Sequence, residues 1–198
     1  MWANGIDERL AFMRLDEPAK RALRAVEQHV TAALPAALGD FYEAIWEHPE
    51  TRGLFADAEQ VRSARRRQIE HWRKIATAEF DQDYVKAVTA VGRVHARIGL
   101  QPRWYIGGYA LLLEALIAAV LVARWPRGGF GVRAPAAMEV AAELGALAKA
   151  TLLDMDYAIT VYLDAGEEAR LQAEAAVMAQ ERGAVVEGLG AGLAALAG

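Results

Sequence analysis

The spacing of the apolar residues constrains the fold of this chain more than any other feature, because it repeats at three and four residues along most of the sequence. Leu23, Val26, Val30 and Leu34 follow this spacing after Asp16, whose side chain is suited to cap a helix. No segment shows the alternation of apolar and polar residues, bounded by Asn-Gly or Asp-Gly turns, that is typical of half-buried strands. The sequence therefore predicts an all-α fold.

Helix-breaking residues divide this pattern into about six predicted helices. Pro35 is expected to separate a first helix, which begins at Asp16, from a second that runs to about His48. Further helices are predicted over residues 58–78, 82–98, 103–124 and 136–164, with a Pro- and Gly-rich loop at 126–135. Gly99 and Pro102 end the helix over 82–98.

The pattern changes character after Gly166. Apolar residues then recur every three or four positions in a largely polar segment, as in a coiled-coil seam: Leu171, Ala175, Met178, Val185, Leu189, Leu193 and Leu196. We therefore predict a domain over residues 1–165 and a helical linker over 166–198 that leads to an output region beyond this sequence. An ordinary oligomerisation helix is the alternative.

Composition excludes several classes of function. The chain has 198 residues, a net charge of -4 and no cysteine. An acidic chain lacks the concentrated positive field that nucleic-acid binding needs, and the arginines at 65–67 are interpreted as the solvated face of a helix. Without cysteine there are no disulfides, no thiolate ligands and no thioether attachment of haem.

Two observations bear on localisation. Residues 1–14 alternate charged and apolar side chains and contain no signal-peptide core, so we expect a cytoplasmic protein. Residues 110–123 form an apolar run that approaches the length of a membrane span, but Glu114 lies near its centre. We interpret this run as a helix buried against protein on most sides, with membrane insertion as the alternative.

One of the four histidines stands out by its position. His95 is predicted to lie on an apolar helix face, one turn before Gly99 and Pro102 redirect the chain. This placement lets an imidazole face a cavity, as an axial ligand of haem iron does. Spacing alone leaves the ordinary alternative open, a surface histidine or one with its hydrogen bonds satisfied.

Three sequence blocks together resemble the globin-coupled sensors, the haem-containing sensor branch of the globins. They are HARIGLQPRWYIGGY at 95–109, DFYEAIWEHPETRGLF at 40–55 and QIEHW at 68–72, and the resemblance covers about residues 10–165. It implies a globin fold with an extra N-terminal helix and a long C-terminal exit helix. It also implies non-covalently bound haem b, with His95 as the iron ligand and Tyr42 over the distal side.

The same resemblance implies the rest of the pocket. Its expected walls are Phe41, Ala64, Gln68, Ile69, Trp72 and Trp104. Tyr105 resembles the family residue near the axial histidine, and its hydroxyl is expected to orient the imidazole, with packing alone as the alternative. The family often has Leu, Ser or Thr on the distal helix where this chain has Ala64, Arg67 and Gln68, so Gln68 is the candidate for a second distal donor.

These features predict a gas sensor without catalytic activity of its own. O2 is the expected ligand, and CO and NO are also expected to bind. A hydrogen bond from the Tyr42 phenol would favour O2 by ~1.5 to 3 kcal/mol and CO much less. The alternatives are a globin enzyme such as an NO dioxygenase, which would need a reductase partner, and a haem-free helical interaction module.

The two long apolar helices expected at 103–124 and 136–164 have more apolar surface than a small domain buries. We therefore expect a homodimer, which in the family forms through a four-helix bundle of these helices. Residues 181–198, ERGAVVEGLGAGLAALAG, look like the linker that opens the signalling regions of soluble bacterial transducers. Chemotaxis signalling is therefore the expected output, with cyclase and kinase outputs as alternatives.

Overall fold

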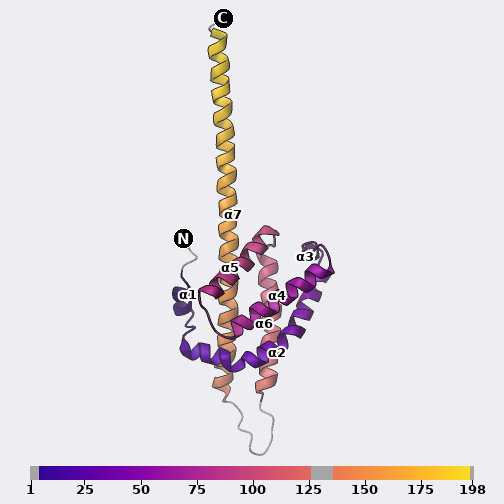
Figure 1. Cartoon of the computed structure of the whole chain (residues 1–198). Helices are drawn as coiled ribbons and strands as arrows, with labels where there is room; N and C mark the ends of the chain where they lie inside the picture. The colour runs from indigo at the N-terminus through magenta and orange to yellow at the C-terminus, as the bar shows by residue number, and fades with distance from the viewer. Residues whose placement is uncertain (1–4, 126–135, 197–198) are drawn as a thin grey trace, which may run out of the picture.

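The computed structural model describes residues 5–125 and 136–196, and within these ranges the chain is helical and contains no strand (Figure 1). The helices are α1 (Ile6–Phe12), α2 (Glu17–Glu47), α3 (Pro49–Arg52), α4 (Ala58–Ala76), α5 (Gln82–Arg97), α6 (Pro102–Arg124) and α7 (Ala137–Leu196). The predicted all-α class is confirmed. The predicted loop at 126–135 lies outside the described residues.

Figure 1 shows α1 to α6 gathered around the first half of α7, whose second half extends away from them to the C-terminus. α5 packs along α7, and α2 crosses α4, α6 and α7. This long C-terminal helix confirms the predicted exit helix, and α1 lies at the position of the predicted extra N-terminal helix. The first half of α7 therefore supports α2, α5 and α6, and α4 packs mainly on α2.

The core lies where α2, α6 and α7 meet. Their inner faces bury Leu34 and Leu38 from α2, Leu116 from α6, and Leu147 and Leu153 from α7. Full burial of such a side chain stabilises the folded state by about 1.5 to 3 kcal/mol. The helical periodicity of the sequence thus marks the faces that meet in this core.

The prediction that Pro35 separates two helices is wrong, because α2 continues through it from Glu17 to Glu47. Leu34, Ala37 and Leu38 on either side of the proline are buried, so packing holds both halves in one helix. The helix changes direction along its length in Figure 1, as a proline inside a helix leads one to expect. The Arg65 guanidinium donates to the carbonyl of Pro35.

The helix starts follow the capping residues of the sequence. Asp16, Asp57 and Asp81 accept backbone hydrogen bonds at the starts of α2, α4 and α5. Gly99 follows α5 with φ of 70°, a left-handed conformation that glycine adopts without strain, and Pro102 opens α6. The predicted bounds of α4, α5 and α6 are confirmed to within two residues.

α6 is the described helix that is long and apolar enough to cross a membrane, by length and composition alone. In the structure Leu112, Leu116 and Val120 of this helix are buried against the rest of the protein. Arg124 at its end forms ion pairs with Glu139 and Glu143 at the start of α7. One face of α6 therefore belongs to the core, but only 17% of its apolar stretch is buried, less than the burial on most sides that the sequence predicted.

α7 has no break near residue 165, so the predicted boundary between domain and linker falls inside one helix. Leu171 and Met178 of the predicted seam are exposed in the single chain. The later members of that seam, from Val185 on, lie where the structure does not describe side chains. The division at 165 stays a prediction.

Candidate functional site

His95 lies in the last turn of α5, directly before the chain turns at Gly99 into α6. Its ring is mostly buried, and among the described residues its Nδ1 is a buried nitrogen with no hydrogen-bond partner. Burial lowers the pKa of His95 to about 4, although the charge of Asp154 acts in the opposite direction. The imidazole is therefore neutral at physiological pH and retains a free lone pair.

Tyr105 on α6 contacts this ring with its edge. The two ring centroids are 4.8 Å apart at an interplanar angle of 64°. The Tyr105 hydroxyl bonds instead to the Tyr109 hydroxyl, at 2.8 Å, so it does not hold the imidazole directly as was expected from the sequence. Beside His95 is a small recess of about 10 Å³, lined by His95, Leu100, Pro102, Tyr105, Ala158, Ile159 and Tyr162.

A buried carboxyl group lies close to these aromatic rings. Asp154 on α7 is fully buried and bonds to His71 Nε2 at 2.8 Å, to the Tyr84 hydroxyl at 3.1 Å and to the Tyr109 hydroxyl. Burial and the charge of Asp154 raise the pKa values of Tyr84 and Tyr109, so both phenols stay protonated. α4, α5 and α6 each contribute one partner to this carboxyl group on α7.

The Asp154 cluster, which comprises Asp154, His71, Tyr84 and Tyr109, was not predicted from the sequence. Its one sequence signal is an aspartate on the inner face of an apolar helix, between Ala150 and Tyr157. A buried carboxyl group is costly unless hydrogen bonds satisfy it, so such a residue predicts polar partners elsewhere in the fold. The partners themselves are 45 to 83 residues away in sequence.

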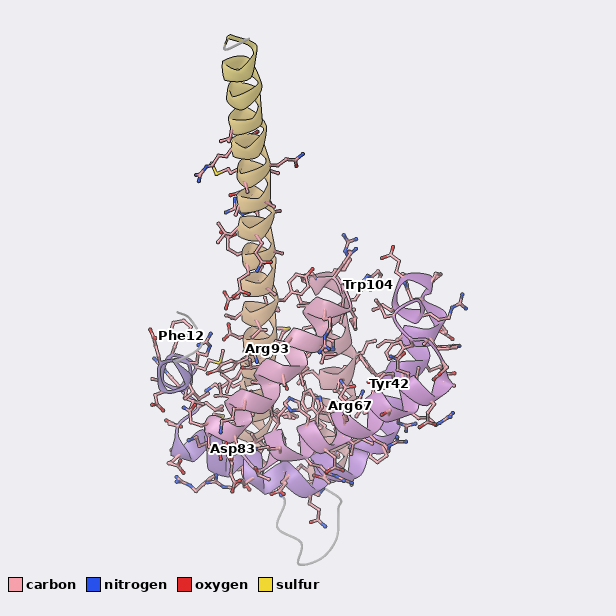
Figure 2. The ribbon with its side chains drawn as sticks, turned by 45° about the horizontal axis from the view of Figure 1, so that its top comes forward. Phe12, Tyr42, Arg67, Asp83, Arg93 and Trp104 are labelled. Carbon is pink, nitrogen blue, oxygen red and sulfur yellow. The ribbon has the colours of Figure 1, made fainter. Side chains whose placement is uncertain are left out.

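Tyr42, the predicted distal residue, is buried on α2. Its ring packs edge-on against Phe41 and Phe55, at centroid distances of 5.0 and 6.2 Å. Burial raises the pKa of Tyr42 to about 12, against the opposing charges of Arg67 and Arg65. Figure 2 shows Tyr42 and Arg67 on neighbouring helices. The phenol is thus a neutral donor.

The other predicted walls divide between α4 and α2. On α4, Ala64 and Ile69 are half-buried, Gln68 lies on the same helix, and Trp72 is buried, with its ring 5.9 Å from that of Tyr109. Phe41 on α2 lies so close to α6 that a Cβ on Gly108 would come within 2.6 Å of its ring. α2, α4 and α6 are therefore brought together around these residues.

Trp104 contacts residues at the junction of α2 and α3. Its indole Nε1 donates to Glu50 at 3.1 Å, and its ring lies 4.2 Å from that of His48. It borders an open groove of about 260 Å³ together with Glu50, Leu54, Gly99, Leu100 and Gln101. Leu100 lines both this groove and the recess beside His95.

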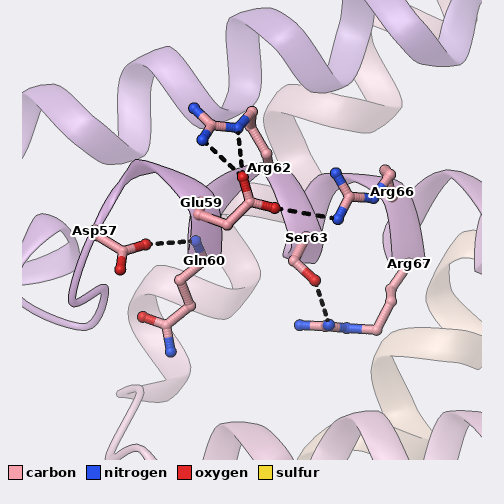
Figure 3. Close-up of polar contacts among 7 residues, drawn as sticks. All are labelled: Asp57, Glu59, Gln60, Arg62, Ser63, Arg66 and Arg67. Carbon is pink, nitrogen blue, oxygen red and sulfur yellow. Dashed lines mark hydrogen bonds and ion pairs between the residues drawn. The ribbon is translucent and has the colours of Figure 1, made fainter.

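The arginines at the start of α4 are engaged with their own helix (Figure 3). Arg62 and Arg66 pair with Glu59, and Arg67 donates to Ser63 at 2.8 Å. Arg66 and Arg67 are exposed, which confirms the solvated helix face that was expected for them. Arg65 differs, since it reaches the Pro35 carbonyl on α2.

The residues around His95 fit a haem iron. No group of three or more His, Cys, Asp or Glu side chains among the described residues is arranged to hold a metal ion. A porphyrin brings four nitrogen donors of its own and needs one neutral imidazole, which the unpartnered His95 supplies. Beside it, the apolar side chains of Val94 and Ile98 are 44% and 40% exposed, so apolar surface is available to a flat hydrophobic ligand.

Comparison with known proteins finds a family that matches most of the chain. The Protoglobin family matches residues 3–168. The heme-based aerotactic transducer HemAT of Halobacterium salinarum is 29% identical over 171 residues, which is 81% of this chain and 34% of that protein. The chain thus spans about a third of the length of this relative.

Two solved globin domains share the fold. The globin domain of the Geobacter sulfurreducens globin-coupled sensor is similar with a TM-score of 0.68 and 14% identity, over 79% of this chain and 97% of that domain. The ferric globin domain of E. coli DosC has a TM-score of 0.55 and 17% identity, over 80% and 97%. Together with the family match, they confirm the expected resemblance to sensor-type globin domains.

Proposed function

This chain belongs to the Protoglobin family, and we propose that it is a haem-based sensor domain for a diatomic gas, with O2 as the first candidate. The observation that carries the proposal is the neutral, mostly buried His95, whose Nδ1 has no partner among the described residues. The likeness to an aerotactic transducer supports sensing rather than catalysis. CO and NO are expected to bind at the same place.

His95 would hold haem b non-covalently, since the chain has no cysteine for a thioether bond. Haem iron supplies one open coordination position for a diatomic ligand. Tyr42 would donate a hydrogen bond to that ligand from the distal side, because its high pKa keeps the hydroxyl protonated. Phe41, Ala64, Ile69 and Trp72 would exclude water, and Gln68 is the candidate second donor.

We further propose that the domain works as a homodimer through residues 103–124 and 136–164. α6 and α7 bury one face in the core and still expose large apolar side chains, among them Leu111 and Val122 on α6 and Leu152 on α7, at 47%, 65% and 47%. A second copy of the chain would cover these residues and bury apolar surface from both.

A signal would leave along α7, which runs without a break from the site to Leu196. Residues 1–165 would form the sensor and 166–198 the linker to an output region, with chemotaxis signalling in the cytoplasm as the expected role. The likeness to an aerotactic transducer, of which this chain matches 34%, supports this arrangement.

Haem binding and its axial ligand test the proposal directly. The purified protein, reconstituted with haem, is expected to show a Soret band and to bind O2 reversibly in the ferrous state. His95→Ala should lose the Soret band, whereas His29→Ala, on α2, should keep it. A protein without a Soret band, or a His95→Ala variant with an unchanged one, would contradict the proposal.

A further inference from the structure

The hydroxyl groups between Tyr105 and Asp154 form a directed chain of hydrogen bonds. The Tyr109 hydroxyl has one proton and donates it to Asp154. The contact of 2.8 Å between the Tyr105 and Tyr109 hydroxyls therefore has Tyr105 as its donor. The order from the imidazole side is Tyr105, then Tyr109, then the carboxyl group on α7.

This chain of hydrogen bonds sets where the Tyr105 ring can lie. The ring is buried and meets His95 edge-on at 4.8 Å, and its hydroxyl is held at the opposite end. Tyr109 is held in turn by Asp154 and by its contact with the buried Trp72 ring. A tyrosine that is fixed at both ends has one orientation toward the imidazole.

We propose that Asp154 is a positioning residue for the axial histidine. Through the Tyr109 hydroxyl, Asp154 holds the Tyr105 ring against His95. The proposal rests on the proposed function, in which His95 is the iron ligand. Because Asp154 belongs to α7, this contact also ties the imidazole to the exit helix. The chain of hydrogen bonds thus links the candidate haem site to the helix that leaves the domain.

A purely structural role for Asp154 makes a different prediction. If Asp154 only stabilised the fold, removing either hydroxyl group that donates to it would have the same effect on His95. Tyr84 and Tyr109 both donate to Asp154, from α5 and from α6. Only Tyr109 also accepts from Tyr105. Tyr109→Phe and Tyr84→Phe therefore form a matched pair, since each removes one hydroxyl from the same carboxyl group and only the first breaks the link to Tyr105.

The first measurement uses the haem-free protein, so it does not depend on the iron. The chain has four histidines, and their imidazole Cε1–H signals can be assigned in the NMR spectrum by substituting each in turn. The ring current of Tyr105 acts on the His95 signal. Tyr109→Phe and Asp154→Asn are expected to shift that signal, whereas Tyr84→Phe should leave it in place.

The second measurement uses the ferrous haem-loaded protein. The iron–histidine stretching band in the resonance Raman spectrum reports how the imidazole is held. The band should shift in Tyr109→Phe and Asp154→Asn and keep its wild-type position in Tyr84→Phe. If Asp154→Asn does not fold, the two tyrosine variants decide alone, with circular dichroism to confirm their helix content.

The outcomes separate this inference from the proposed function. A His95 signal that stays in place in Tyr109→Phe, or that shifts as much in Tyr84→Phe, would overturn the positioning role. An iron–histidine band that keeps its wild-type position in Tyr109→Phe would also overturn the positioning role. If the NMR pattern is as expected but the wild type shows no Soret band, the positioning contact stands and the proposed haem function fails.

Discussion

Gly92 of α5 lies against Ala158 of α7 so closely that a Cβ on the glycine would come within 3.1 Å of both the Cα and the carbonyl oxygen of Ala158. The same added Cβ would lie 3.0 Å from the Cβ of Val161. Gly92 precedes His95 by one turn of the same helix. The approach of α5 to α7 therefore places the imidazole next to the exit helix.

Gly92→Ala is expected to destabilise the protein, because the neighbouring atoms belong largely to the backbone of α7 and cannot move aside cheaply. Overpacking of this kind costs about 1 to 3 kcal/mol, which exceeds the gain of about 0.5 to 1 kcal/mol from alanine in a helix. Urea unfolding measures the difference. Gly107→Ala on α6, where a Cβ would meet nothing within 4 Å, should be neutral or stabilising.

Tyr42→Phe should speed O2 dissociation and leave CO release nearly unchanged. The variant removes the hydrogen bond that the neutral phenol is proposed to donate, worth roughly ten- to a hundredfold in O2 affinity. Stopped-flow displacement of each gas from the ferrous protein gives both rates, and CO serves as the internal control. Equal O2 release from wild type and variant would refute the distal role of Tyr42.

The stability of the haem-free protein should depend on pH through His95. Its pKa is about 4 in the folded state and 6.5 for a histidine in an unfolded chain, so between these values the unfolded chain binds more protons. Stability therefore rises with pH across this window and is lost as pH falls from 6.5 toward 4. A shift of this size corresponds to about 3 kcal/mol.

Unfolding of the wild type and of His95→Leu at pH 7 and at pH 4 isolates this effect, since the other titrating groups are common to both. The wild type should lose up to about 3 kcal/mol more than the variant between the two pH values. An identical loss in both proteins would mean that His95 is not buried as a neutral group.

Leu152→Glu should convert the proposed dimer into a monomer. The side chain lies on the outer face of α7 and is 47% exposed in the single chain, so a charge there costs little in the monomer and much in a dimer interface. Light scattering after size exclusion gives the mass. Ala25→Glu, at an exposed position of α2, should leave the mass unchanged.

Local patterns were enough to predict most helices and one half of the candidate site. Asp16 caps α2 where the sequence expects, because capping depends on residues three positions apart. His95 precedes Gly99 by four residues, and that spacing alone placed it in the last turn of a helix. Pro35 was misread, since burial of Leu34 and Leu38 outweighs the hydrogen bond that a proline removes.

The all-α class, the start of α2 and the place of His95 on its helix follow from the sequence, because each depends on residues within a turn or two. The surroundings of the imidazole depend on contacts between distant helices. Asp154 meets His71 and Tyr109 across 83 and 45 residues of chain, and no local pattern encodes which helices will bring them together. The packing of α4, α5 and α6 against α7 sets those contacts, because a buried carboxyl group is stable only where its partners converge.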